Sequence, residues 1–80
     1  MAGQKMIIGE NDRIPVPPDV LSKLKLKPGS TITLKTIIGP NGKVENLKAM
    51  IGPNGMIQIP KDVMTKLGVK KGGSVEIIWH

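Results

Sequence analysis

Six lysines gather in two groups of three, and each group lies near the C-terminal end of a predicted short helix. The groups are Lys23, Lys25 and Lys27, and Lys66, Lys70 and Lys71. A lysine ammonium contacts a phosphate oxygen as a point charge and reads the edges of bases poorly. Lysines at such a place also complement the negative end of the helix dipole. The pattern therefore predicts either a pair of phosphate-binding patches or two solvated helix ends.

Residues that could support catalysis are few. His80 is the only histidine and the last residue, and we expect it to be frayed rather than catalytic. Glu10 and Asp12 lie near a predicted turn, where carboxylates normally face solvent. The chain has no cysteine, so neither a disulfide framework nor a cysteine zinc site can form. We therefore predict a protein that is not an enzyme and that holds no metal or cofactor.

The overall charge favours an anionic partner. Twelve basic residues against six acidic ones give a formal net charge of +6. Such an excess attracts polyanions such as DNA, RNA or anionic lipid. The alternative is a lysine-rich surface that only keeps the protein soluble.

The lysine groups are positioned by two copies of one nine-residue stretch, residues 16–24 and 59–67. Each copy reads as the end of a strand, a proline and a short amphipathic helix. Proline lacks a backbone N–H, so it ends a strand and suits the start of a helix. Val20 and Leu24 lie four residues apart and therefore on one helix face, and the second copy has an equivalent pair.

The two predicted helices end on different residues. Gly68 follows the second helix, where a left-handed cap is expected. Lys25 holds the matching place after the first helix. We expect the cap at Lys25 to be more strained or differently shaped, because a side chain disfavours the left-handed conformation.

The whole chain overlays itself without a gap when it is shifted by 43 residues. Ile14 then falls on Ile57, and Asp19 falls on Asp62. A gapless repeat is typical of duplication, and two copies are too few for a solenoid. We predict one domain, residues 1–80, made of two strand-strand-helix-strand units, residues 1–43 and 44–80, joined by a hairpin turn at 39–42.

The predicted fold class is mainly β, with six short strands and two short helices in a small closed barrel with pseudo-two-fold symmetry. Closure of the barrel removes strand edges that would invite aggregation. The expected strands are 5–9, 13–16, 31–37, 44–52, 56–59 and 74–79. The apolar positions shared by both units are expected to form the core: Ile14, Val16, Val20, Leu24, Leu26, Ile32, Leu34, Ile57, Ile59, Val63, Leu67, Val69, Val75 and Ile77.

The length and hydropathy predict a small cytoplasmic protein. No apolar run approaches the roughly 18 residues needed to cross a membrane. The N-terminal residues carry no long apolar segment of the kind found in signal peptides. Because both units lie in one chain, we expect a monomer, with a domain-swapped dimer opened at the 39–42 turn as the alternative.

Residues 55–72 resemble the AbrB/MazE/SpoVT family. The resemblance lies in Ile57-Gln58-Ile59-Pro60, in the helix that ends at Leu67-Gly68-Val69, and in Gly72. It covers about 25 residues of each unit and implies membership of the wider cradle-loop barrel group, which includes the swapped-hairpin, RIFT and double-psi barrels. With two units in one chain, the sequence is similar to a double-psi or RIFT barrel.

The resemblance also implies a function. Arg13 matches the position of the family's DNA-contacting arginine, so the resemblance implies non-catalytic DNA binding of the transcription-regulator type. The site would then comprise Arg13 and the two lysine groups, with DNA contacted through its backbone phosphates. The alternative is a double-psi-type barrel scaffold, natural or engineered, or a protein-interaction module without a nucleic-acid ligand.

Overall fold

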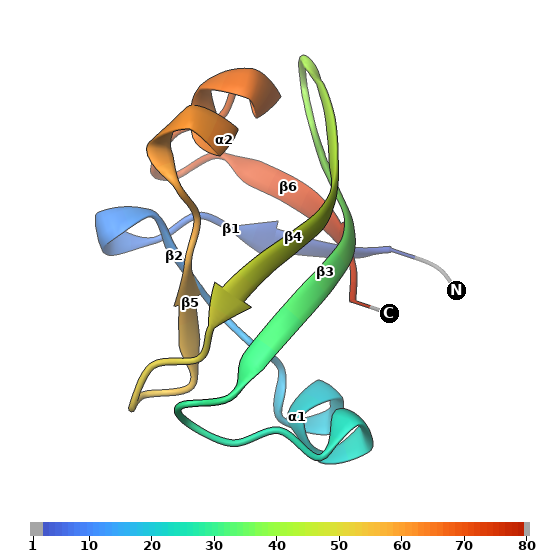
Figure 1. Ribbon diagram of the computed structural model, residues 1–80. Coiled ribbons are helices and arrows are strands. Elements are labelled where there is room, and N and C mark those ends of the chain that lie inside the picture. Colours follow the sequence, from blue (N-terminus) through green and yellow to red (C-terminus); the bar gives the residue numbers. More distant parts are fainter. Residues whose placement is uncertain (1–2, 80) are drawn as a thin grey trace.

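The computed structural model describes residues 3–79, and Met1, Ala2 and the predicted frayed His80 lie outside the described residues. Six strands and two short α-helices follow one another, as predicted. The elements are β1 (Gln4–Ile7), the 3-10 helix η1 (Glu10–Asp12), β2 (Arg13–Pro15), α1 (Pro18–Leu24), β3 (Thr31–Gly39), β4 (Gly42–Met50), β5 (Met56–Gln58), α2 (Lys61–Leu67) and β6 (Ser74–Ile78) (Figure 1).

The strands pair in two antiparallel sheets. Four strands form one sheet in the order β1-β6-β3-β4, and β2 pairs with β5 in a second sheet. Among residues 3–79 no strand pairing joins the two sheets, so the expected closure into one continuous barrel is absent from the observed pairing. The fold is therefore mainly β, with two antiparallel sheets and a short helix at either end.

Backbone hydrogen bonds in the first half of the chain recur in the second half at the 43-residue offset of the sequence repeat. The amide of Ile8 donates to the carbonyl of Gly73 over 2.9 Å, and the amide of Ile51 donates to the carbonyl of Ser30 over 2.9 Å. The register of β1 on β6 is likewise repeated in the register of β4 on β3. Equivalent backbone groups of the two halves thus find equivalent partners.

Both helices end in the same left-handed conformation. Lys25 has φ 57° and ψ 44°, and Gly68 has φ 71° and ψ 35°. Of the two outcomes expected for Lys25, the structure thus has the strained residue and not a differently shaped cap. A non-glycine residue in this region costs roughly 1–2 kcal/mol, because its Cβ approaches the following carbonyl oxygen.

Nine of the predicted core residues are buried: Ile14, Val16, Ile32, Leu34, Ile57, Ile59, Leu67, Val75 and Ile77. The other five are partly exposed and pack against this core, as residues at its edge: Val20, Leu24, Leu26, Val63 and Val69. All five lie in the helices or just after them. Each helix packs against the core with one side, so its other side faces solvent. Six further residues complete the core: Met6, Ile8, Ile37, Ile51, Met64 and Trp79.

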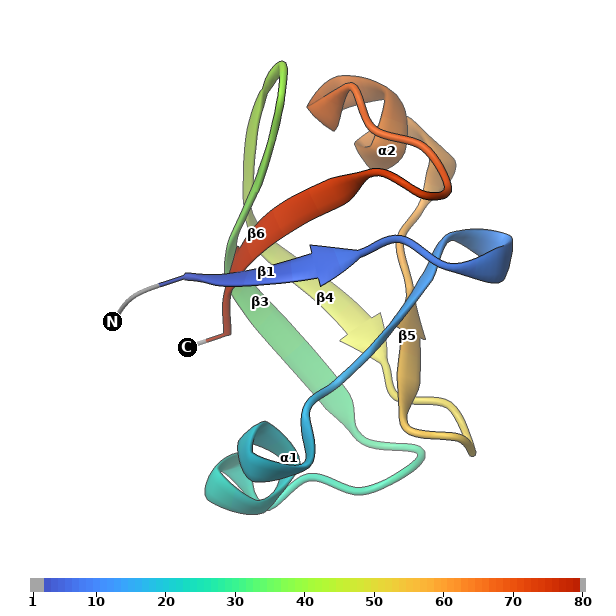
Figure 2. The same ribbon diagram turned by 180° about the vertical axis from the view of Figure 1, so that it is seen from behind.

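The β3–β4 hairpin reaches past the sheet and lies beside α2, whereas α1 lies at the opposite end of the molecule (Figures 1 and 2). The amide of Asn41, in the hairpin turn, donates to the carbonyl of Leu67 over 3.0 Å. This contact fixes the hairpin to the C-terminal end of α2.

Candidate nucleic-acid interface

The first lysine group lies at the C-terminal end of α1 and is here named the α1 lysines: Lys23, Lys25 and Lys27. Lys23 is in the last turn of the helix, Lys25 is its left-handed cap, and Lys27 is in the loop that follows. All three side chains are exposed. Within residues 3–79 none of them forms a salt bridge with a carboxylate. Their charges are therefore available to an external anion.

The second group lies at the C-terminal end of α2 and is here named the α2 lysines: Lys66, Lys70 and Lys71. Lys71 forms an ion pair with Glu10 of η1. Both partners are well exposed, with 61% of the Lys71 and 78% of the Glu10 side chain accessible, so the pair contributes little to stability. The pair nevertheless places the carboxylate of Glu10 beside the α2 lysines. Within residues 3–79 no carboxylate pairs with the α1 lysines.

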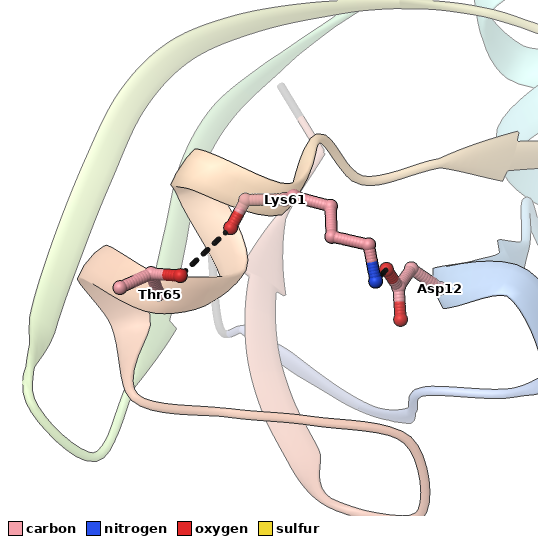
Figure 3. Close-up of polar contacts among 3 residues, drawn as sticks. All are labelled: Asp12, Lys61 and Thr65. Atoms are coloured by element: carbon pink, nitrogen blue, oxygen red, sulfur yellow. Dashed lines mark hydrogen bonds and ion pairs between the residues drawn. The ribbon is translucent and has the colours of Figure 1, made fainter.

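A second acidic residue of η1 lies at the same end. The Nζ atom of Lys61, the first residue of α2, is 3.7 Å from a carboxylate oxygen of Asp12 (Figure 3). The hydroxyl of Thr65 donates to the Lys61 carbonyl over 3.0 Å, within the same helix. Asp12 is largely buried, with 17% of its side chain exposed, and Lys61 is almost fully exposed. Lys61 was not among the predicted site residues, because its partner is distant in the sequence.

The two lysine groups are not brought together. They follow helices that lie at opposite ends of the molecule in both views (Figures 1 and 2). The structure thus contains two separate basic ends, one of them partly neutralised by η1. The two groups are equivalent in the sequence, whereas in the structure a carboxylate, that of Glu10, pairs with one of the α2 lysines and none within residues 3–79 pairs with the α1 lysines.

Arg13 lies apart from both lysine groups. It is exposed on β2, opposite Gln58 of β5, and it lines a depression of about 300 Å³ together with Asn54, Met50 and Met56 among others. None of the six lysines lines this depression. The polar neighbours of Arg13 were missed from the sequence, because only the pairing of β2 with β5 places them beside it.

Among residues 3–79 no group of three histidine, cysteine, aspartate or glutamate side chains is placed to hold a metal ion. No helix within these residues is both long enough and apolar enough to cross a membrane.

Comparison with known proteins supports the fold alone. No protein-family model matches the chain, and no curated protein matches it. The chain is similar to the solution structure of PHS018 from Pyrococcus horikoshii, with a TM-score of 0.75 and 21% sequence identity. The match covers 99% of this chain and 90% of that one. The mainly β arrangement of strands and helices is therefore shared with a solved protein.

Proposed function

We propose that the protein binds nucleic acid without catalysis, through the backbone phosphates, and that the α1 lysines form the principal contact. One observation supports this most directly: all three α1 lysines are exposed and unpaired within residues 3–79, whereas Glu10 and Asp12 lie beside basic residues at the other end. An unpaired ammonium gains more from a phosphate, because no internal ion pair must first be broken.

The binding should be weak and tolerant of sequence. All three residues of this group are lysines, which contact phosphate as point charges and read the edges of bases poorly. Non-specific affinities of this kind lie around 10⁻⁴–10⁻⁶ M at physiological salt. Such a protein would coat or bridge a nucleic acid rather than select an operator.

Arg13 provides a separate contact in this proposal. The resemblance to AbrB-type regulators implies a DNA-contacting role for it, and its exposed position beside Gln58 leaves the guanidinium free for a phosphate. Because the six lysines lie outside its depression, Arg13 should act independently of the α1 lysines. Replacing Arg13 by alanine should reduce the salt slope by about one unit.

The finer fold type is also a proposal. We infer that the two sheets belong to a cradle-loop barrel of the double-psi or RIFT type, supported by the repeated hydrogen-bond pattern. Closure would place β2 and β5 along the outer edges of β1 and β4. The amides on those edges should then exchange slowly with solvent, and rapid exchange along both edges would contradict closure.

The function is tested by titrating the full chain with a short DNA duplex at several salt concentrations. Each phosphate neutralised contributes about −0.9 to the slope of log K against log salt, so three lysines predict a slope of about −3. Arg13 would bring it to about −4. If no binding is detected at low salt, the proposal fails and the interpretation as a scaffold or protein-interaction module becomes the better one.

A further inference from the structure

The two helices are covered differently at their C-terminal ends. At α2, a Cβ built on Gly39 of the hairpin would lie 2.7 Å from the Cβ of Leu67, so the hairpin backbone touches the helix. The Asn41 amide also donates to the Leu67 carbonyl over 3.0 Å. Under this cover Met64 and Leu67 are buried, at 5% and 0% exposure. This helix surface therefore packs against a hairpin that presents a small residue at the point of contact.

Among residues 3–79 no segment covers the corresponding surface at α1 in this way. Leu21 and Leu24 hold the places of Met64 and Leu67, and both are only half-buried. Among residues 3–79 no backbone amide donates to the Leu24 carbonyl. The residues that are covered at one end of the molecule are therefore partly exposed at the other, next to a main-chain carbonyl that no amide of residues 3–79 engages. We name this surface, Leu21 and Leu24 with the Leu24 carbonyl, the α1 face.

The charge at the α1 face indicates the chemistry of an occupant. At the α2 end, a Cβ built on Gly68 would lie 2.5 Å from the side-chain nitrogen of Asn41. Lys25 holds the place of Gly68 in the same left-handed conformation, so its side chain begins in the space that corresponds to Asn41. An occupant at α1 must therefore meet an ammonium there, with Lys23 and Lys27 nearby in the sequence. A carboxylate is the complementary group.

We propose that the α1 face docks an extended acidic segment of a partner protein. The segment presents a small residue to Leu24, donates a main-chain N–H to its carbonyl, and places an aspartate or glutamate against Lys25. This contact reproduces, between two molecules, the one that the hairpin makes with α2. It does not depend on nucleic-acid binding, because it requires Leu21 and Leu24, which a phosphate backbone does not need. The two ligands share Lys25 and should compete.

The chain's own hairpin supplies a probe. It is a synthetic peptide of residues 36–47 that carries Asn41→Asp and Lys43→Glu, and the unmodified peptide is its control. Methyl NMR of the full chain follows Leu21 and Leu24 at α1 and Met64 and Leu67 at α2. The α2 methyls serve as an internal control, because the covalent hairpin already covers them at a high effective concentration.

The proposal predicts that the acidic peptide shifts the Leu21 and Leu24 methyls at about millimolar concentration and leaves those of Met64 and Leu67 unchanged. The Lys25→Glu variant should weaken this binding by about threefold to tenfold, in line with one exposed charge pair and its reversal. Lys27→Glu, at an exposed loop position, provides a second variant should Lys25→Glu alter the fold. The unmodified peptide should bind more weakly than the acidic one.

Three results would overturn the proposal. The first is the absence of any shift at Leu21 and Leu24 with the acidic peptide. The second is binding that is equally strong in the charge-reversal variants. The third is a shift of the same methyls by a DNA duplex or by raising the protein concentration, with none by the peptide. That result would assign the face to nucleic acid or to a second copy of the chain.

Discussion

Gly39 and Leu67 lie so close together that no side chain fits between them. A Cβ at position 39 would be 2.5 Å from the carbonyl oxygen of Leu67 and 2.7 Å from its Cβ. Such distances do not occur between real atoms of this kind, so a side chain would force the hairpin away from α2. The contact therefore requires glycine for space and not for backbone freedom.

Replacing Gly39 by alanine should destabilise the protein by about 1–3 kcal/mol, the usual cost of overpacking a close contact. Gly52→Ala is the matched control, because a Cβ there meets its nearest atoms at an ordinary 3.5 Å. That variant should change the free energy of unfolding by about 0.5 kcal/mol or less. Urea denaturation measures both. Equal losses in the two variants would show that the hairpin does not press against α2.

Lys25→Gly should stabilise the fold. The left-handed backbone at Lys25 costs roughly 1–2 kcal/mol for a residue with a side chain, part of which is offset by the greater freedom of glycine when unfolded. A net gain of about 0.5–1 kcal/mol is expected in thermal or urea unfolding. Lys23→Gly, inside the helix, should instead lose about 1 kcal/mol. A loss in both variants would contradict the strained cap.

Truncation of the two equivalent leucines should have unequal effects. Leu67→Ala removes a fully buried side chain and should cost roughly 2–5 kcal/mol. Leu24→Ala removes a half-buried one, and we expect a loss of about 1–2 kcal/mol. Urea unfolding of both variants measures the difference. A larger loss at Leu24 would mean that α1 is covered in solution.

The chain is expected to be monomeric, because its 39–42 turn closes the hairpin and the Asn41 amide holds it to Leu67 over 3.0 Å. Light scattering at micromolar concentration should give the mass of one chain. A stable dimer that persists on dilution would support the domain-swapped alternative, with the hairpin opened at this turn.

Much of the fold could be predicted from the repeat. Ile14 and Ile57 fall on each other in the sequence, and the structure pairs them across β2 and β5. The strands and helices follow from alternating apolar residues, prolines and turn glycines, which are local signals. The order of the strands is not local, because it depends on which edges meet in three dimensions. The observed sheets therefore could not be derived from the spacing.

The candidate site was predictable only in part. The lysines could be placed at the helix ends, since Lys23 and Lys66 each lie in a last turn. Their inequality could not be predicted, because Glu10 reaches Lys71 across 61 positions of sequence. The exposure of Leu24 was missed for a related reason. The two units match at many positions, but among residues 3–79 the 39–42 hairpin covers α2 and not α1.

The proposal that the α1 lysines form the principal contact is tested most directly by comparing two triple variants in duplex DNA binding. In one, Lys23, Lys25 and Lys27 are all replaced by alanine, and in the other Lys66, Lys70 and Lys71 are replaced. The two variants lose the same charge, so only position distinguishes them. Loss of the α1 lysines should flatten the log–log salt slope by about 2–3 units, whereas loss of the α2 lysines should leave it almost unchanged, because they are not the principal contact and Glu10 already engages Lys71. A larger effect of the α2 variant, or equal slopes for both variants and the unaltered chain, would contradict the principal role of the α1 lysines in binding nucleic acid.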